Sequence, residues 1–295
     1  MIIENTGLKR FESFFLILLA VLTISSFFVV NSLAFQNFGL RVFFLDVGQG
    51  DAIFIEAANG NQILIDGGPD NKILSELPKV MPVGDRSIDL VVLTHPDADH
   101  LNGLIEVLRR YDVGQVLENQ ADFNNPAYAV WDKLKNEKTE VARAKAGQVI
   151  NIDRETTMLI LYPFADEQPD SKNNNNSIVA KLIYGNFSVL FPGDIETKLE
   201  KKLIGQLVEL DSDFLKLAHH GSKTSTTEEF LDLVSPEAVF ISVAGKNSYG
   251  HPSPLVIDRL EKRQIKYYRT DKEGSIKLEF GNSSYQISSE KIYAQ

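Results

Sequence analysis

The side chains best suited to chemistry in this sequence are five histidines and the aspartates beside them, which fall in three short segments. The densest segment is His95-Pro96-Asp97-Ala98-Asp99-His100, which follows an apolar run. Imidazoles and carboxylates together suit divalent ions such as Zn, Mn or Fe. Alternation directs His95 and Asp97 one way and Asp99 the other, so the segment can hold two neighbouring ions rather than one. Two such ions stabilise both the attacking and the leaving oxygen of a displacement. A solvated polar turn, the simpler interpretation, would not need all four side chains.

Later segments add further candidate ligands. Asp194 ends the motif FPGD after an apolar run, and its two oxygens could bridge two ions. His219 and His220 follow another apolar run. One of the two can complete the coordination of an ion, while the other contacts the substrate or protonates a leaving group. His251 precedes a predicted helix, where a plain surface histidine is the alternative. Asp194, taken alone, is more typical of an ordinary turn.

Two polar segments are candidates for contacts around such a site. Ser222 and Lys223 lead into Thr224-Ser225 just before a predicted helix, and hydroxyls, an ammonium group and a helix N-terminus can hold a phosphate. An ordinary surface lysine is the alternative for Lys223. Asp51 follows Gly48-Gln49-Gly50 and is a candidate for a position near the site. The alternative is that the two glycines only allow a tight connection between strands.

The elements that must position these residues are short strands interspersed with helices. A two-residue turn, Gly185-Asn186, joins two of the strands into a hairpin. The order of elements predicts two sheets packed face to face with helices outside, and functional loops at the strand ends. Strands are predicted at 40–45, 52–57, 61–65, 90–93, 157–161, 178–184, 187–191, 214–217, 238–242, 266–268, 276–280 and 284–287. Helices are predicted at 101–110, 127–136, 198–207, 227–233 and 254–263.

Composition narrows the possible classes of protein. The 295 residues are 43% hydrophobic and 24% charged, which is typical of a globular chain rather than a disordered or multi-span membrane protein. The sequence has no cysteine, which excludes disulfides, thiolate metal sites and a cysteine nucleophile. The formal charge of −10 argues against a protein that coats DNA through a broad basic face.

The first 38 residues predict a separate segment. No charged residue occurs from Ser13 to Leu40, and Lys9 and Arg10 precede this stretch. The apolar run is long enough for a membrane anchor, and the basic residues before it place the rest of the chain outside the cytoplasm. A cleaved signal peptide, with Ser32-Leu33-Ala34 as its cleavage site, would also export the rest. A buried core helix is the third interpretation. Residues 39–295 then form the catalytic domain.

Six ordered motifs carry a family resemblance: LDVGQGDA, LIDGG, THPDADH, FPGD, LAHHGS and YGHPS. Together they resemble the metallo-β-lactamase fold, and more closely the extracellular C-terminal domain of the ComEC family of DNA-uptake proteins. The resemblance covers residues 39–280. It implies an αββα sandwich, preceded here by the N-terminal apolar helix, with a metal site for Zn or Mn at one edge.

The resemblance also implies two sets of ligands. His95, Asp97 and Asp194 would bind one ion, and Asp99, His100, Asp194 and His220 the other, while Asp66 would hold the His95–His100 loop. This sequence departs from the common pattern because Asp97 stands where many members carry histidine. No histidine lies between His100 and His219, so the usual third ligand of the first ion is missing. Asn173–Ser177 occupies that region.

The favoured function is an exported metal-dependent phosphodiesterase or nuclease linked to DNA uptake or processing, with Asp99 and His219 in catalytic roles. Its partners would be single-stranded DNA or another phosphodiester, and the membrane. The alternatives are a metallohydrolase of another ester, amide or lactone, and a non-catalytic, metal-stabilised binding module at the cell envelope. Asp97 and the missing histidine count against a β-lactamase.

Overall fold

A computed structural model describes residues 14, 16–23, 25–26, 39–119, 125–165, 167, 169–170, 173–281 and 283–290. The chain divides into two compact units, Met1–Gly39 and Leu40–Gln295. The described residues before 39 are helical, and the rest of the predicted N-terminal segment lies outside the described residues. Among the described residues, no helix combines the length and apolar content needed to cross a membrane. The anchor therefore stays a prediction.

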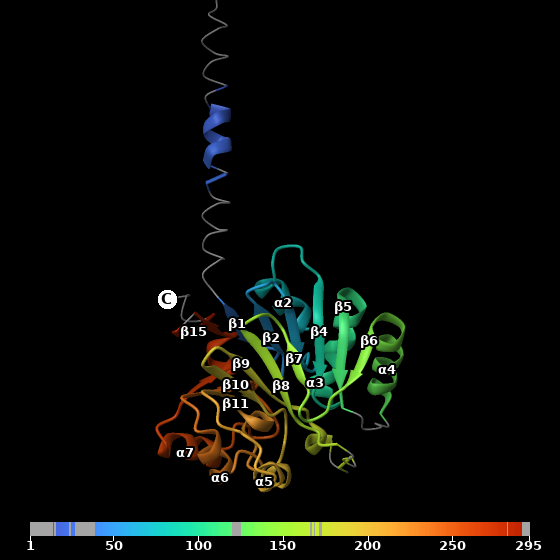
Figure 1. Cartoon of the computed structure of the whole chain (residues 1–295), viewed down its shortest axis with the longest axis vertical. Coiled ribbons are helices and arrows are strands. Elements are labelled where there is room, and N and C mark those ends of the chain that lie inside the picture. The colour runs from blue at the N-terminus through green and yellow to red at the C-terminus, as the bar shows by residue number, and fades with distance from the viewer. Residues whose placement is uncertain are drawn as a thin grey trace, which may run out of the picture. The chain divides into compact units, whose positions relative to one another are not determined.

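The second unit contains two β-sheets (Figure 1). The first has the strand order β15-β14-β1-β2-β3-β4-β5-β6, and the second has the order β13-β12-β11-β10-β9-β8-β7. The first sheet consists of β1 (Leu40–Phe44), β2 (Ile53–Ala57), β3 (Gln62–Ile65), β4 (Ser87–Leu93), β5 (Asp112–Glu118), β6 (Glu140–Arg143), β14 (Ile276–Phe280) and β15 (Tyr285–Ser289). The second consists of β7 (Val149–Asn151), β8 (Thr156–Tyr162), β9 (Val179–Tyr184), β10 (Phe187–Phe191), β11 (Phe214–Lys216), β12 (Ala238–Ile241) and β13 (Lys266–Arg269).

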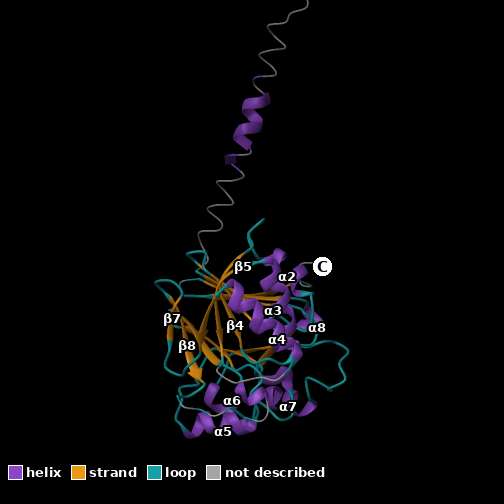
Figure 2. Cartoon of the chain, turned by 90° about the vertical axis from the view of Figure 1, so that its right-hand side faces the viewer, coloured by secondary structure: helices purple, strands orange, loops and turns teal. Residues whose placement is uncertain are grey.

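Helices cover the outer faces of the two sheets. Figure 2 shows α2, α3 and α4 in one group and α5, α6 and α7 in another. The helices are α2 (Ile73–Val80), α3 (Ala98–Arg110), α4 (Pro126–Lys138), α5 (Thr197–Gly205), α6 (Glu228–Val234), α7 (Pro254–Lys262) and α8 (Thr270–Glu273). Two short 3₁₀ turns, η1 (Asn173–Asn176) and η2 (Ala218–Gly221), lie in loops.

Alternation along the strands builds three apolar layers. In β1, Val42 and Phe44 point into the layer between the sheets, whereas Phe43 points into the layer beneath α2–α4. In β4, Val92 faces the inner layer and Val91 the outer one, as expected for a strand buried on both faces. A third layer fills the space between the second sheet and α5–α7. The predicted αββα sandwich is therefore confirmed.

The strand directions decide where the loops meet. β3 runs parallel to β4, and β10, β11 and β12 run parallel to one another. Their carboxyl ends lie together at one edge of the sandwich, so the residues that follow them converge from both sheets. The second unit begins at Leu40, which pairs with Ala57 across β1 and β2. Ala57 lies close to the start of β3, so Leu40 lies at the edge of the sandwich opposite the carboxyl ends of these strands.

Candidate metal centre

Four of the predicted ligands meet at the edge where these strands end. Their ligating atoms all lie within 4.8 Å of one another, and the four residues are Asp99, His100, Asp194 and His220. Asp194 Oδ2 lies 3.3 Å from the Nε2 atoms of both His100 and His220. His220 Nε2 is also 3.5 Å from Asp99 Oδ2. The set inferred for the second ion is thus assembled by α3, the loop after β10 and the turn after β11.

The hydrogen bonds of the two imidazoles leave one nitrogen of each directed at the cluster. His220 Nδ1 lies 2.9 Å from the Ser242 carbonyl oxygen, which can only accept, so Nδ1 carries the proton. His100 Nδ1 lies 2.8 Å from Asp66 Oδ2. The Nε2 atoms of both rings are buried and have no hydrogen-bond partner among the described residues. This is how proteins orient histidine ligands toward a metal, and a divalent cation fits the site.

Charge also favours a cation at this place. Burial opposes the protonation of His220, but Asp194 and Asp51 outweigh it and raise the pKa of His220 to about 9. Burial likewise opposes protonation of His100, yet Asp194 and Asp66 raise its pKa well above the ordinary value. Buried carboxylates need nearby positive charge, and a metal ion supplies it in place of these protons.

Asp66 holds a residue of the cluster in place through hydrogen bonds. Its side chain is fully buried, with Oδ1 accepting from the Thr94 backbone N–H at 2.8 Å and Oδ2 from the Thr94 hydroxyl at 2.6 Å. Oδ2 also contacts His100 Nδ1. One carboxylate therefore fixes both the start of the loop and an imidazole, which is the role that the resemblance implied for it.

The set inferred for the first ion is incomplete in the structure. His95 Nε2 lies 3.7 Å from Asp97 Oδ2, but neither residue belongs to a group of three or more potential ligands among the described residues. Asp97 Oδ1 accepts a hydrogen bond of 2.7 Å from Asn173 Nδ2. Ser177 Oγ lies 3.3 Å from His95 Nδ1. The segment Asn173–Ser177 thus occupies the place where the missing histidine was expected, with amide and hydroxyl groups.

The structure separates the positions of the two neighbouring histidines. The His220 side chain is 1% exposed, whereas that of His219 is 22% exposed, with its Nε2 3.9 Å from Asp194 Oδ2. Burial lowers the pKa of His219. Its ring also contacts the ring of His251, at 5.6 Å between centroids. His219 and His251 therefore lie beside the cluster, on the more open side.

The backbone at the cluster adopts a rare conformation. Asp66, His219 and His220 all have positive φ angles, of 58°, 50° and 52°. Such residues cost about 1–3 kcal/mol each and are concentrated at functional sites. Gly221, at φ 82°, comes next, and a Cβ there would stand 2.6 Å from Pro252 Cβ. The turn that carries the histidine pair is thus held against the loop that carries His251.

Asp51 lies within the site together with a residue that the sequence analysis did not identify. Lys216, the last residue of β11, is fully buried and forms an ion pair with Asp51, and its Nζ lies 3.5 Å from Asp194 Oδ1. Asp51 Oδ1 is also 3.5 Å from His220 Nδ1. Gly50 permits this approach, because a Cβ there would lie 2.0 Å from the Asp99 carbonyl oxygen. A lysine inside an otherwise apolar strand was the available signal.

Ser222 and Lys223 make fewer contacts with the cluster than expected. The buried Ser222 hydroxyl lies 3.0 Å from Thr224 Oγ1, and Lys223 is exposed. The next helix, α6, begins only at Glu228, and Thr227 caps it. The helix N-terminus is therefore separated from Ser222 by several residues, and two glutamates occupy its first turn. This arrangement does not favour the predicted phosphate cradle.

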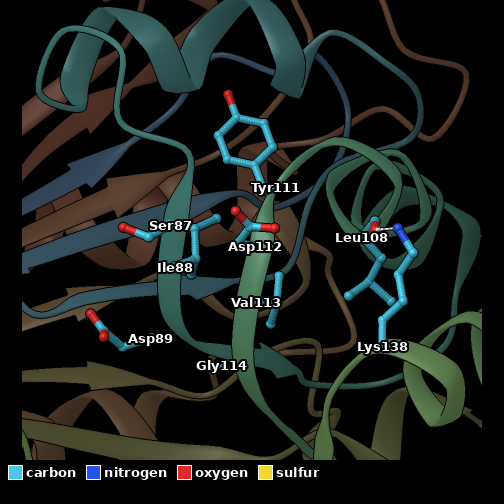
Figure 3. A pocket seen from close by; sticks show the side chains of 9 residues that line it. All are labelled: Ser87, Ile88, Asp89, Leu108, Tyr111, Asp112, Val113, Gly114 and Lys138. Atoms are coloured by element: carbon cyan, nitrogen blue, oxygen red, sulfur yellow. Dashed lines mark hydrogen bonds between the residues drawn. The ribbon is translucent and has the colours of Figure 1, made fainter.

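One cavity lies away from this cluster. It has a volume of about 450 Å³ and is lined by residues such as Ser87 and Asp112, the first residues of β4 and β5 (Figure 3). Lys138 at its rim donates to the Leu108 carbonyl at 2.8 Å. The cavity shares no residue with the histidine and aspartate cluster, which follows the opposite ends of the strands.

This fold and this cluster agree with the comparisons to known proteins. The chain belongs to the metallo-β-lactamase superfamily, which matches residues 45–246. The chain is also 30% identical over 256 residues to ComE operon protein 3 of Bacillus subtilis strain 168. It is 28% identical over 281 residues to competence protein ComA of Neisseria gonorrhoeae. The similarity to competence proteins is thus confirmed.

The alignments differ in how much of each protein they cover. They include 81% and 93% of this chain but 33% and 37% of those relatives, so the chain spans about a third of their length. Among solved structures, Igni18, a metallo hydrolase from Ignicoccus hospitalis, matches with a TM-score of 0.55 at 18% identity, over 81% of this chain and 99% of that one. Zn²⁺-bound PqqB from Methylobacterium extorquens matches with a TM-score of 0.52 at 11% identity, over 82% and 100%. These structures support the fold alone.

Proposed function

We propose that the protein is a metal-dependent phosphodiesterase that cleaves single-stranded DNA outside the cytoplasm. The observation that carries this proposal is the group of partly buried Asp99 with buried His100, Asp194 and His220, whose imidazole Nε2 atoms have no hydrogen-bond partner among the described residues. The relative named "Competence protein ComA" in Neisseria gonorrhoeae, and one named "Recombination protein 2" in Haemophilus influenzae, support DNA as the substrate.

The four side chains would hold one divalent ion, and a mixed set of imidazoles and carboxylates suits Zn or Mn. When bound, such an ion polarises a phosphoryl oxygen and makes a coordinated water more acidic. Asp66 and the Ser242 carbonyl keep the two imidazoles in the required orientation. Lys216 places a fixed positive charge 3.5 Å from Asp194 Oδ1, while Asp194 Oδ2 faces the two imidazoles and would be the oxygen available to an ion.

Incubation of the purified chain with labelled single-stranded DNA tests the proposal. We expect cleavage with Mn²⁺ or Zn²⁺, loss of cleavage with a chelator, and recovery when the metal is restored. Hydrolysis of bis-p-nitrophenyl phosphate should follow the same pattern, and a β-lactam should remain intact. Turnover of a lactam or carboxylic ester without turnover of any phosphodiester would favour the alternative function, a metallohydrolase of another ester, amide or lactone. Retention of metal without any turnover would favour the binding module.

His219 is the residue to which we assign contact with the leaving oxygen, because its ring lies beside Asp194 on the exposed side. Removal of a proton donor matters most when the leaving group is a poor one. His219→Ala should therefore slow DNA cleavage by about 10²-fold or more, but slow bis-p-nitrophenyl phosphate hydrolysis much less. Its metal content, measured by elemental analysis, should equal that of the unmodified protein. An equal loss of rate on both substrates would contradict the assignment of His219 to the leaving oxygen.

The location of the protein is a further part of the proposal. We infer that residues 1–38 hold the chain at the membrane, because no charge occurs from Ser13 to Leu40 and Lys9 and Arg10 precede this stretch. Leu40 enters the catalytic unit at the edge opposite the metal cluster. Protease is added to cells whose outer layers are permeabilised and whose cytoplasmic membrane is intact. It should digest the catalytic unit, and complete protection of this unit would contradict export.

A further inference from the structure

Tyr249 is exposed beside the proposed active site. It lies in the loop between β12 and α7, and its side chain is 69% exposed. The other exposed aromatic residue described in the second unit is Tyr285, which is 39% exposed and donates a hydrogen bond to Glu237. Tyr249 makes no hydrogen bond to the described residues. An aromatic ring left open to water in this way is suited to contact with another flat ring.

A row of aromatic rings connects Tyr249 to the metal cluster. The Tyr249 ring stacks on the His251 ring with centroids 5.7 Å apart and an angle of 18° between the planes. The His251 ring in turn meets the edge of His219, at 5.6 Å and 70°. His219 Nε2 lies 3.9 Å from Asp194 Oδ2. One face of Tyr249 is therefore fixed by His251, and the row ends at the proposed reaction centre.

The loop that carries Tyr249 is held by one asparagine. Asn247 Nδ2 donates to the carbonyl oxygens of Ala244 and His251 at 2.9 and 2.8 Å, and its Oδ1 accepts from the His251 N–H at 2.9 Å. Gly250, with φ 73°, allows the turn between Tyr249 and His251. Because these bonds form within the protein itself, the backbone of the loop is held before any ligand binds, which reduces the entropic cost of binding.

We propose that the open face of Tyr249 stacks on a nucleobase adjacent to the phosphodiester at the metal cluster. This subsite rests on the proposed function, which it makes specific for a single strand. Every base presents a π face to an aromatic ring, whereas the bases of a duplex are already stacked and paired. The net charge of −10 limits attraction to phosphates, so a stacking contact explains how an acidic protein engages DNA.

Two exposed lysines lie on the segments that carry Tyr249 and the histidine pair. Lys246 precedes Asn247, and Lys223 lies on the turn that Ser253 joins through a 2.8 Å hydrogen bond to the Gly221 carbonyl. Each lysine adds one positive charge to a segment that also contributes a residue to the site.

The competing explanation is that Tyr249 only covers His251. A cover would affect every phosphodiester alike, since its loss would act through His251 and His219. A stacking subsite affects only ligands that carry a base. Oligonucleotides in which every base is replaced by an abasic spacer therefore separate the two explanations.

Binding is measured by fluorescence anisotropy with labelled oligothymidylate of about 12 nucleotides, a length within the usual range of single-strand sites. The full chain carries Asp99→Asn in all samples so that the DNA is not cleaved. We expect Tyr249→Ala to raise the Kd for oligothymidylate about ten-fold or more, a change of about 1.4 kcal/mol. The Kd for the abasic oligomer should change less than about two-fold, and Tyr249→Phe should restore the affinity because it keeps the ring.

Tyr285→Ala serves as the matched control, because it removes an exposed aromatic ring at the opposite edge of the sandwich. It should leave both dissociation constants unchanged. Equal weakening on both oligomers, no change on either, or absence of oligothymidylate binding by the parent would overturn the subsite. Failure of the proposed function is distinguishable, because it would be seen as absence of DNA cleavage by the protein with intact Asp99, whatever the binding result.

Discussion

The Asp99→Asn/His100→Ala protein should lose DNA cleavage and bis-p-nitrophenyl phosphate hydrolysis while most of its fold is retained. Both residues belong to the group whose ligating atoms lie within 4.8 Å of one another. Replacing even the outer partners of metal ligands costs roughly 10–100-fold in affinity or activity, so losing two direct ligands should cost more than about 100-fold. The rate with Mn²⁺ or Zn²⁺ and the bound metal per chain are the quantities to measure.

The two substitutions should differ in their effect on stability. The Asp99 side chain is 31% exposed, so its amide replacement can be solvated. His100 is fully buried and contacts Asp66, so its removal leaves a buried carboxylate with one partner fewer. Asp99→Asn alone should therefore melt close to the unmodified protein, and the pair should melt lower. Full activity in the double variant, with the metal still bound, would place the reaction centre elsewhere.

A matched control distinguishes loss of the metal site from general damage. Asp258→Asn also removes an aspartate from a helix, but Asp258 is half exposed and its partner is Lys262 on the surface. It should retain full activity and full metal content. If it lost activity to the same degree as Asp99→Asn, the measured loss would not report on ligation.

Strongly apolar elements could be predicted from the sequence, and exposed ones could not. The hairpin of β9 and β10 was expected because two buried runs flank Gly185-Asn186. β5, β6 and β7 were not predicted, because exposed positions dominate parts of each. The helix α2 was missed because it is short and contains Pro78. Pairing with neighbouring strands stabilises the three strands, parallel for β5 and β6 and antiparallel for β7, and that pairing is not visible in local sequence.

Helix boundaries show the same limitation at the site itself. Apolar spacing predicted a helix from Leu101, whereas α3 begins at Ala98 after the cap residue Asp97. The first turn carries Asp99 and His100, which point into the cluster instead of the core. Periodicity reports only the residues that build the core, so the turn that supplies ligands does not contribute to it.

The candidate site was predicted from its motifs to the extent that each motif contained histidine or aspartate. Asp66, Asp194 and His220 lie where the resemblance implied. Lys216 was missed because a single lysine has no motif of its own, and its partner Asp51 is 165 positions earlier in the chain. Lys216 ends β11, which pairs with β10, and Asp51 lies in the loop after β1. Only the packing of the two sheets brings Lys216 and Asp51 together.

Replacing Lys216 with Met should destabilise the metal-free protein by about 3–5 kcal/mol, the usual cost of breaking a buried ion pair from one side. The ammonium group is fully buried beside Asp51, which is itself 1% exposed, and it lies 3.5 Å from Asp194. Methionine fills a similar volume, so the loss reports on the unpaired carboxylates more than on a cavity. Urea unfolding followed by circular dichroism measures the difference.

The double variant Asp51→Asn/Lys216→Met identifies the cause of that loss. Replacing both partners of a buried pair by neutral groups is often close to neutral, because no charge remains unpaired. The double variant should therefore recover a large part of the stability that Lys216→Met loses. Lys262→Met is the control: its pair with Asp258 is exposed, and its removal should leave the free energy of unfolding nearly unchanged. If the double variant were no more stable than Lys216→Met, the Asp51 charge would not be the source of the loss, and Asp194 would be the remaining carboxylate that needs the lysine.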